Sequence, residues 1–377
     1  MPLSIGIPKE IEAGERRVAI VPVVAEKYIK KGFKVIIEKG AGDESYIRDC
    51  EFDDINFVDS AAEVYQQSDV IFKVQAPTES EIELIKDGTI IFALMQPHRF
   101  PERVKKMRDN KVSSIAMELV PRISRAQSMD VLSSQASAAG YKAVLMGANL
   151  SSQFFPMLTT AAGTIRPAKV LIIGAGVSGL QAIATARRLG AIVEAYDVRA
   201  VTKEQVESLG AKFLQLEVDA ASDGGYAREL TETEKHKERD MLADHIAKAN
   251  VVITTAAIPG RTAPRLIDKE MVDRMKPGAV IVDLAAESGG NCELTEAGET
   301  IDHNGVLVHG PENVPSMLSV NTSEMYAKNC QNLLDLMIVD GELKPDWEDE
   351  VLAGCSLTRD GEIKHEATRT LVEGEQS

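Results

Sequence analysis

The chain has 377 residues, of which 44% are hydrophobic and 27% are charged, a composition typical of a soluble globular protein with two domains. Its formal net charge of −16 at pH 7 excludes electrostatic binding to nucleic acid or anionic membranes, because phosphates would be repelled. No apolar run approaches the roughly 20 residues of a membrane helix, so direct membrane insertion is not expected. The cysteines lie far apart, without metal-binding or CxxC spacing, which favours free thiols in a reducing cytoplasm and no bound metal.

The first half of the chain alternates short apolar runs with helical ones. Such an alternation predicts a parallel α/β sheet. The predicted strands are Ile5–Pro8, Val35–Glu38, Val70–Val74, Thr89–Met95 and Ser113–Leu119, and the predicted helices are Val23–Lys31, Ala61–Gln67, Glu79–Ile85 and Pro101–Asp109.

A second α/β series follows with the same rhythm. Its predicted strands are Lys169–Gly174, Ile192–Val198, Lys212–Leu216, Val251–Ala256, Ala279–Ala285 and Val306–His309, with the clearest helices at Gly179–Leu189 and Lys203–Leu209. Asp130–Leu150 is free of proline and rich in Ala, Ser and Leu, which predicts a long helix with the domain boundary near its start. Ser316–Val339 is a second predicted long helix, suited to a return crossing.

These elements predict an α/β fold with two Rossmann-like, doubly wound parallel-sheet domains joined by long helices. The expected domains are residues 1–132 completed by 325–377, and residues 133–324. The tail from Val351 to His365 is expected to form a small hairpin of two strands around the turn Arg359-Asp360-Gly361.

The clearest functional signal is a glycine-rich turn between an apolar strand and a helix. Lys169–Ile173 is the strand, and GAGVSG follows at once. In a dinucleotide-binding domain, Gly174 would permit the tight turn, Gly176 would let the backbone approach a pyrophosphate, and Gly179 would let the helix pack on the strand. The free N–H groups of the first helical turn, from Val177 on, would bind the phosphates.

Asp197 ends the next predicted strand, 18 residues after Gly179. A carboxylate there would accept hydrogen bonds from the ribose hydroxyls of NAD(H) and repel the 2′-phosphate of NADP(H). Arg199, two residues later, could instead accommodate that phosphate. The sequence therefore predicts NAD(H), with Arg199 as the feature that leaves NADP(H) open.

Other segments near the predicted strand ends also bear on the site. Small residues at 255–260, including Ala257, would let an adenosine or ribose lie close, and 283–291 belongs to the same carboxyl edge. Residues 219–240 are dominated by charged side chains around Gly225 and Tyr226. That segment is either a solvated loop that leads into a charged helix or a mobile flap over the nucleotide.

The histidines do not supply an obvious general base. A dehydrogenase that oxidises an alcohol or amine needs a proton acceptor beside the reacting carbon. Only His98 and His309 are placed where a cleft residue could lie. No Ser/His/Asp, zinc or phosphate-loop pattern stands out.

A polar set precedes the long helix. Arg122, Gln127, Asp130 and Ser133 are spaced so that, from Gln127 on, one helical face would carry Gln, Asp and Ser together. One interpretation is an N-terminal helix cap with a solvated face. The other is a set that holds a nicotinamide carboxamide and ribose at the domain junction.

These motifs together resemble those of one family. They are residues 121–134 (PRISRAQSMDVLSS), 174–179, 197–200 (DVRA), 202–210 (TKEQVESLG), 224–227 (GGYA), 289–291 (GGN) and 313–316 (NVPS). From about residue 5 to about residue 365, the chain resembles the NAD(H)-binding component of proton-translocating nicotinamide nucleotide transhydrogenase. The wider relatives are the alanine dehydrogenases, which share the two-domain fold.

The resemblance also implies a difference from alanine dehydrogenase, whose substrate site uses an arginine, a lysine, a histidine and an aspartate. Arg17 and Lys73 are expected in the first two positions, Gln96 in place of the histidine and Glu287 in place of the aspartate. Glutamine cannot accept a proton. An alignment shifted by two residues would put His98 there instead.

The transhydrogenase resemblance implies that hydride passes between NADH, bound to this chain as a substrate, and NADP⁺ on a partner subunit. No general base is then needed. Arg122, Gln127, Asp130 and Ser133 would position the nicotinamide, and Gly225 and Tyr226 would belong to a flap. It further implies a homodimer on the cytoplasmic side of the inner membrane, peripheral to it through NADP(H)-binding and membrane-spanning subunits, with hydride transfer coupled to proton translocation.

Two other interpretations remain open from the sequence. One is a freestanding NAD-dependent amino-acid dehydrogenase with His98 as its base. The other is a non-enzymatic NAD-sensing module that regulates a membrane partner.

Overall fold

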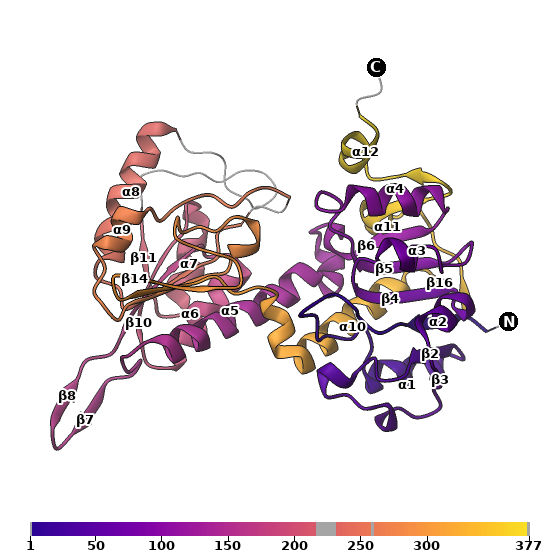
Figure 1. Ribbon diagram of the computed structural model, residues 1–377, viewed down its shortest axis with the longest axis horizontal. Helices are drawn as coiled ribbons and strands as arrows, with labels where there is room; N and C mark the ends of the chain where they lie inside the picture. The colour runs from indigo at the N-terminus through magenta and orange to yellow at the C-terminus, as the bar shows by residue number, and fades with distance from the viewer. Residues whose placement is uncertain (1, 216–230, 258–259, 375–377) are drawn as a thin grey trace. The chain divides into compact units, whose positions relative to one another are not determined.

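The computed structural model describes residues 2–215, 231–257 and 260–374. The chain divides into two compact units, which Figure 1 draws as ribbons. Unit 1 comprises residues 1–135 and 316–377, and unit 2 comprises residues 136–315. None of the described helices is both long and apolar enough to cross a membrane.

Unit 1 contains a sheet with helices on both of its faces. Its elements in chain order are β1 (Ser4–Ile7), α1 (Pro22–Lys30), β2 (Lys34–Glu38), the 3₁₀ turns η1 (Asp43–Ser45) and η2 (Asp49–Glu51), β3 (Asn56–Val58), α2 (Ala61–Gln67), β4 (Val70–Gln75), α3 (Glu79–Ile82), β5 (Ile90–Leu94), α4 (Pro101–Asp109), β6 (Ser113–Ala116), η3 (Met117–Leu119), η4 (Ser124–Met129) and the start of α5 (Val131–Leu150). After unit 2 come α10 (Ser319–Asp335), β16 (Ile338–Val339), β17 (Glu342–Leu343), α11 (Glu350–Cys355), β18 (Ser356–Arg359), β19 (Glu362–Ile363) and α12 (Glu366–Glu373).

The sheet of unit 1 has the strand order β19-β18-β6-β5-β4-β1-β2-β3. The run from β3 to β6 is the doubly wound order 3-2-1-4-5-6, with β1 and β4 at the switch point. Alternate residues of β4 enter different cores: Phe72 packs with Tyr28 and Tyr326 on one face, and Ile71 packs with Met107 on the other. Both faces are therefore buried, as a parallel sheet requires.

Unit 2 repeats this architecture. It contains the rest of α5, then β7 (Leu158–Thr160), β8 (Gly163–Ile165), β9 (Lys169–Ile173), α6 (Val177–Arg188), β10 (Ile192–Tyr196), η5 (Ala200–Thr202), α7 (Lys203–Ser208), β11 (Lys212–Leu214), α8 (Glu232–Ile246), β12 (Val251–Thr254), α9 (Lys269–Asp273), β13 (Val280–Asp283), η6 (Ala286–Ser288), β14 (Thr300–His303) and β15 (Val306–His309). The turn η7 (Val314–Leu318) leads back to unit 1.

The main sheet of unit 2 has the order β11-β10-β9-β12-β13-β15-β14. Its first six strands again follow the order 3-2-1-4-5-6, which puts β9 and β12 at the switch point. Helices α5 and α6 cover one face and α8 and α9 the other. The predicted α/β fold with two doubly wound sheets is confirmed.

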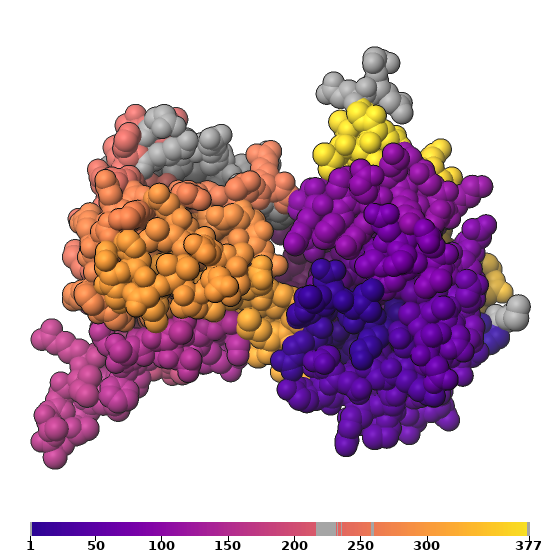
Figure 2. Space-filling view, viewed as in Figure 1, coloured from indigo at the N-terminus to yellow at the C-terminus, as the bar shows by residue number. Residues whose placement is uncertain are grey.

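Both sheets are mixed, which the sequence did not predict. In unit 1, β18 pairs antiparallel with β6 and β19, and in unit 2, β14 pairs antiparallel with β15. The short strands β3, β7, β8 and β14 were also not predicted. Figure 2 shows the β7–β8 hairpin projecting from the body of unit 2.

The tail differs from its prediction in one segment. Residues 351–355, expected in a strand, belong to the helix α11. The reason is a cap: Oδ1 of Asp349 accepts hydrogen bonds from the backbone N–H of Val351 (2.9 Å) and Leu352 (3.4 Å), which satisfies the first helical turn. The hairpin that follows is confirmed, since Asp360 and Gly361 both have positive φ between the paired strands β18 and β19.

Candidate functional site

The glycine turn links β9 to α6, as the sequence predicted, and each glycine has a different role. Gly174 has φ +96°, and its N–H donates to the carbonyl of Tyr196 (2.8 Å). A Cβ atom on Gly179 would lie 1.8 Å from the carbonyl oxygen of Gly174, so the helix contacts the turn at backbone distance. A Cβ on Gly176 would meet nothing within 4 Å. Gly176 therefore faces open space, whereas Gly174 and Gly179 hold the turn together.

The N-terminus of α6 lies at this open space. Its N-cap residue is Gly176, which provides no side-chain cap, and Val177 in the first turn is exposed. The unpaired N–H groups of a first helical turn, with the positive end of the helix dipole, form a site for anions. The turn thus fits a dinucleotide pyrophosphate in its backbone conformation and in its open space.

Asp197 follows β10 and lies beside the glycine turn. Its Oδ2 accepts the N–H of Ala175 (2.8 Å), which ties the carboxylate to the turn. Its two oxygens also accept Nε and Nη2 of Arg199 (2.9 and 2.8 Å), and Oδ1 accepts the backbone N–H of Arg199 (2.9 Å). The structure therefore brings Asp197 and Arg199 together as an ion pair at the edge of the glycine turn.

The loops after β12 and β13 are held by a fully buried carboxylate, that of Asp283. Its Oδ1 accepts Oγ1 of Thr254 and the N–H of Ala285, and its Oδ2 accepts the N–H groups of Asn291 and Cys292 and Oγ1 of Thr295. These five bonds, of 2.7–3.0 Å, fix the polypeptide at the carboxyl edge of the sheet, where doubly wound folds bind ligands.

Asn291 connects these two loops. Its Oδ1 accepts the N–H of Ala256 (3.1 Å), and its Nδ2 donates to the carbonyls of Ala256 and Pro264 (both 2.8 Å). The neighbouring Ala257 is exposed at the end of β12. The sequence singled out the segments around 255–260 and 283–291, but it did not predict that Asp283 and Asn291 join them. The pattern of a strand that ends in Asp, followed by Gly-Gly-Asn, was the available signal.

The polar set before α5 lies in unit 1, and its arrangement corrects one expectation. Gln127 lies in the 3₁₀ segment η4, and Asp130 has extended backbone (φ −73°, ψ 94°) between η4 and α5. The expectation of one helical face that carries Gln127, Asp130 and Ser133 is therefore wrong. Asp130 acts as a cap, because its carboxylate accepts the N–H of Ser133 (2.9 Å) and Oγ of Ser133 (2.6 Å). Arg122 and Gln127 are exposed.

The charged segment is described only from residue 231 on. The helix α8 begins at Glu232, with Thr231 and Glu234 as a capping box. Gly225 and Tyr226, the predicted flap residues, lie outside the described residues.

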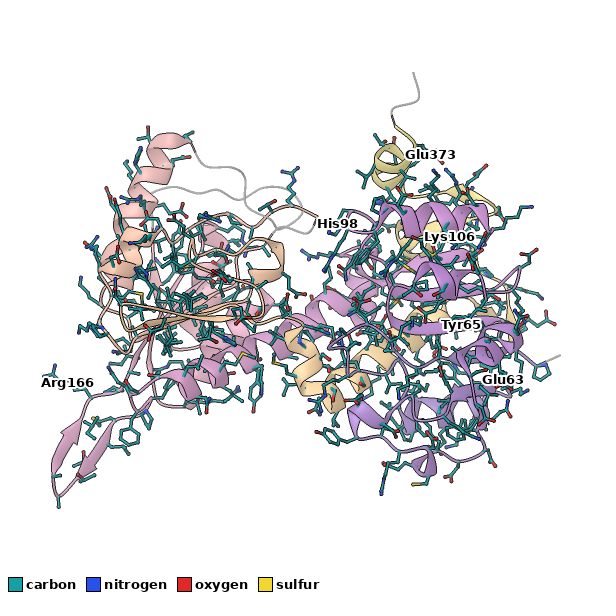
Figure 3. All side chains as sticks on the ribbon, viewed as in Figure 1. Glu63, Tyr65, His98, Lys106, Arg166 and Glu373 are labelled. Carbon is teal, nitrogen blue, oxygen red and sulfur yellow. The ribbon has the colours of Figure 1, made fainter. Side chains whose placement is uncertain are left out.

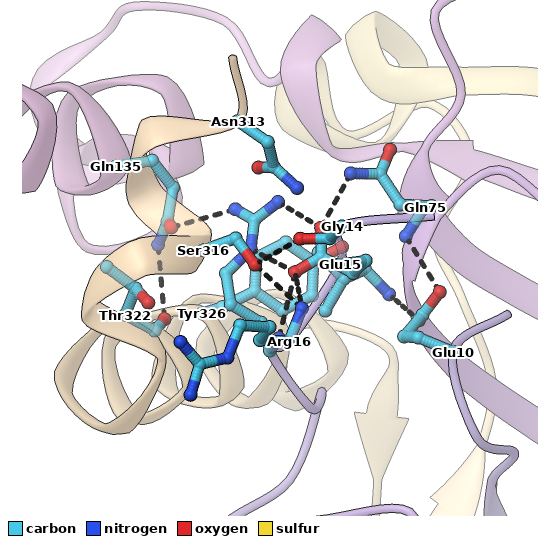
Figure 4. A network of polar contacts seen from close by, with 12 residues as sticks. Glu10, Gly14, Glu15, Arg16, Gln75, Gln135, Asn313, Ser316, Thr322 and Tyr326 are labelled. Atoms are coloured by element: carbon cyan, nitrogen blue, oxygen red, sulfur yellow. Dashed lines mark hydrogen bonds and ion pairs between the residues drawn. The ribbon is translucent and has the colours of Figure 1, made fainter. Parts of the chain in front are cut away.

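The two cations expected from the comparison with alanine dehydrogenase, Arg17 and Lys73, lie in unit 1 and are paired within the chain. Nε and Nη2 of Arg17 donate to the two carboxylate oxygens of Glu15 (2.8 and 2.5 Å), and Nη1 donates to Gln135 (2.9 Å; Figure 4). Nζ of Lys73 lies 2.8 Å from Glu81 and 3.4 Å from Glu10. These buried cations therefore have carboxylate partners from the chain itself.

The pKa of Glu15 reflects this pairing. Burial by itself would raise the pKa of the carboxyl group, but the hydrogen bonds and charge of Arg17 and the hydrogen bond from Gln75 lower it to about 2. Glu15 is thus a carboxylate at neutral pH and neutralises Arg17.

Neither candidate for a general base is well placed. Gln96 stands after β5 with φ +44°, and its N–H donates to Glu118 (2.5 Å). His98 is exposed at the surface of unit 1 (Figure 3). In unit 2, Nδ1 of His309 lies 2.8 Å from Oγ1 of Thr300. Glu287 is exposed in η6 of the same unit.

Comparisons with known proteins agree with this geometry. Residues 6–139 match the family "Alanine dehydrogenase/PNT, N-terminal domain", and residues 143–366 match "Alanine dehydrogenase/PNT, C-terminal domain". The first of the chains that make up NAD(P) transhydrogenase subunit alpha in Rhodospirillum rubrum is 46% identical, over 97% of this chain and 98% of its own.

A crystal structure and a second relative extend the comparison. The crystal structure of transhydrogenase from Sinorhizobium meliloti superimposes with a TM-score of 0.85 at 43% identity, covering 97% of this chain and 99% of its own. Alanine dehydrogenase of Methanococcus maripaludis is more distant, at 32% identity over 84% of this chain and 82% of its own. The resemblance predicted from the motifs is confirmed: the chain belongs to the alanine dehydrogenase/PNT family, in its transhydrogenase alpha-subunit group.

Proposed function

We propose that this chain is the NAD(H)-binding subunit of a proton-translocating NAD(P) transhydrogenase. It would pass hydride between NADH and NADP⁺ bound on a partner subunit, coupled to proton translocation across the membrane. The observation that carries the proposal is a dinucleotide-binding turn, with open space at Gly176 and Asp197 beside it, in a chain 46% identical to a transhydrogenase alpha subunit.

The chemistry of this reaction fits the side chains present. Hydride leaves the dihydronicotinamide of NADH as a hydrogen nucleus with two electrons and joins the nicotinamide of NADP⁺, so NAD⁺ and NADPH form without uptake or release of a proton. The chain then has to position the ring and exclude water, and it needs no general base. Gln96 and the exposed His98 are consistent with that requirement.

We assign the two ends of NAD(H) to separate sets of residues. The glycine turn (Gly174, Gly176, Val177 and Gly179) would hold the pyrophosphate, and Asp197, Arg199 and Ala257 the adenosine side. By resemblance to the family, Arg122, Gln127, Asp130 and Ser133 would position the nicotinamide, with Gly225 and Tyr226 in a flap. The Asp130–Ser133 pair supports this assignment for those two residues, because it fixes both side chains relative to the start of α5.

The function can be tested with purified chain and a purified NADP(H)-binding partner. The chain alone should bind NADH more tightly than NADPH. Transfer of hydride from NADH to an NADP⁺ analogue should appear only when both components are mixed. NAD-dependent oxidation of alanine by the chain alone would contradict the proposal and favour an amino-acid dehydrogenase.

Gln127→Asn should slow hydride transfer far more than it weakens NADH binding. The substitution keeps the amide but withdraws it by one methylene, and transfer depends on sub-ångström positioning of the two rings. We expect a fall of about tenfold to hundredfold in the single-turnover rate. The check is stopped-flow transfer beside an NADH titration. A collapse in affinity at an unchanged single-turnover rate would refute the assigned role.

The partners follow from the same proposal. A membrane-spanning subunit and an NADP(H)-binding subunit would hold this chain at the cytoplasmic face of the inner membrane. We also propose a homodimer. Support comes from the projecting β7–β8 hairpin: Phe154, Met157 and Ile165 at its base and edge are exposed, as is Arg166 (Figures 2 and 3). An isolated hairpin is marginally stable and exposed apolar side chains favour a protein contact. Light scattering should report twice the chain mass.

The amino-acid dehydrogenase has less support. A site for an amino-acid carboxylate needs an arginine that can accept it, and Arg17 already makes a two-point contact with Glu15. The NAD-sensing module shares the nucleotide site, so only the transfer assay with the partner separates it from the transhydrogenase.

A further inference from the structure

The carboxylate of Asp197 is fully engaged by the chain itself. Oδ1 accepts the backbone N–H and Nε of Arg199, and Oδ2 accepts the N–H of Ala175 and Nη2 of Arg199. An ionised carboxylate has about four acceptor positions. A ribose hydroxyl can therefore hydrogen-bond to Asp197 only after one of these four donors leaves.

The four donors differ in how easily they can move. The N–H of Ala175 belongs to the glycine turn, which is tied to β10 by the hydrogen bond from Gly174 to Tyr196. The N–H of Arg199 belongs to the backbone that enters η5. The guanidinium is at the end of a flexible side chain that is 20% exposed, whereas the Asp197 side chain is 6% exposed. The guanidinium is therefore the donor that a ribose would displace.

A displaced guanidinium remains near the ribose. It is linked to the chain two residues after Asp197, and its Nη2 begins 2.8 Å from the oxygen that the hydroxyl would take. Arginine at this place in a doubly wound domain is the group that accommodates a 2′-phosphate, through planar paired hydrogen bonds. The same arrangement thus contains a ribose acceptor and, held by it, a phosphate ligand.

We propose that Arg199 is a latent ligand for a 2′-phosphate and that Asp197 keeps it occupied. The preference for NAD(H) is then set by the ion pair, and not by repulsion from Asp197 alone. The inference rests on the proposed NAD(H) site at the glycine turn. Its consequence for the reaction is that NADP(H), which has to bind on the partner, is kept off this chain.

The test measures NADH and NADPH dissociation constants for the full chain and for Asp197→Asn, Arg199→Ala and the double variant. Asp197→Asn removes the charge that holds the guanidinium but keeps the size of the side chain. NADPH should gain at least about tenfold relative to NADH. Adding Arg199→Ala should remove most of that gain. A gain that survives in the double variant means that only repulsion was lost, and it overturns the proposal, as does the absence of any gain.

Two further measurements keep the outcomes separate. Asp244→Asn is the matched control, because Asp244 accepts Nη2 of Arg274 (2.8 Å) on exposed positions of α8 and the residue after α9, and it should leave the NADPH-to-NADH ratio unchanged. If Asp197→Asn does not fold, Arg199→Ala alone should weaken NADPH more than NADH, and an unchanged ratio refutes the proposal. A native chain that fails to bind NADH refutes the proposed function instead.

Discussion

Gly179→Ala is expected to destabilise unit 2 by about 3 kcal/mol and to abolish measurable NADH binding. The new Cβ would lie 1.8 Å from the carbonyl oxygen of Gly174, and neither group can turn away, because both are held by backbone. Gly174 in particular is fixed by its positive φ and by its hydrogen bond to Tyr196. Helix α6 would therefore have to withdraw from the turn. Urea unfolding and NADH fluorescence titration measure the two effects.

Gly176→Ala is the matched comparison within the same turn. Its Cβ would meet nothing in the chain, and its φ of −75° suits alanine, so the free energy of unfolding should fall by at most about 1 kcal/mol, the cost of alanine at an N-cap. NADH affinity should nevertheless fall by about tenfold or more, since the methyl group occupies the space of the approaching pyrophosphate. Unchanged NADH affinity in a folded Gly176→Ala variant would contradict a pyrophosphate at this turn.

The elements of the fold that the sequence predicted well depend on local signals. An apolar strand, a glycine turn and a helix follow one another within residues 169–188, and each signal is written in neighbouring residues. The same holds for α4, which begins at Pro101 as predicted. Residues 351–355 were wrongly expected in a strand, because a short apolar run fits either state and the deciding contact is the Asp349 cap.

The polar sets were harder to predict, because one spacing fits two conformations. Asp130 and Ser133 stand three residues apart, which suits both one face of a helix and an N-cap with its third helical residue. The extended backbone at Asp130 decides for the cap, and no residue pattern fixes that angle. The Asp197–Arg199 pair presents the same difficulty, since a two-residue spacing brings side chains together only when the loop turns.

The network at Asp283 could not be predicted from spacing at all. Its partners come from the end of β12, the loop after β13 and the segment that follows, with Thr254 standing 29 residues away. Only the parallel pairing of β12 with β13 brings Thr254 opposite Asp283. The sequence marks each segment as a strand end, and the sheet makes them one site.

Asp283→Asn is expected to lower the free energy of unfolding by about 3 kcal/mol or more. The side chain is fully buried, and each of its oxygens accepts at least two hydrogen bonds. An amide NH₂ in place of either oxygen would face donors, which leaves at least two buried N–H or O–H groups without an acceptor. Gly290 leaves little room for adjustment, because a Cβ on it would already lie 3.0 Å from Oδ2 of Asp283.

The same substitution should weaken NADH binding, since Asn291 is held by Asp283 and in turn holds Ala256 beside the predicted adenosine site. Asp302→Asn is the control in the same unit: Asp302 is exposed and accepts one backbone N–H, from Gly305, and an amide oxygen can replace that acceptor within about 0.5 kcal/mol. Urea unfolding of both variants gives the comparison, and NADH titration at low urea gives the second effect. Equal stabilities for the two variants would mean that the five bonds of Asp283 contribute no more than one exposed turn, and the carboxylate could not then be what fixes the loops after β12 and β13.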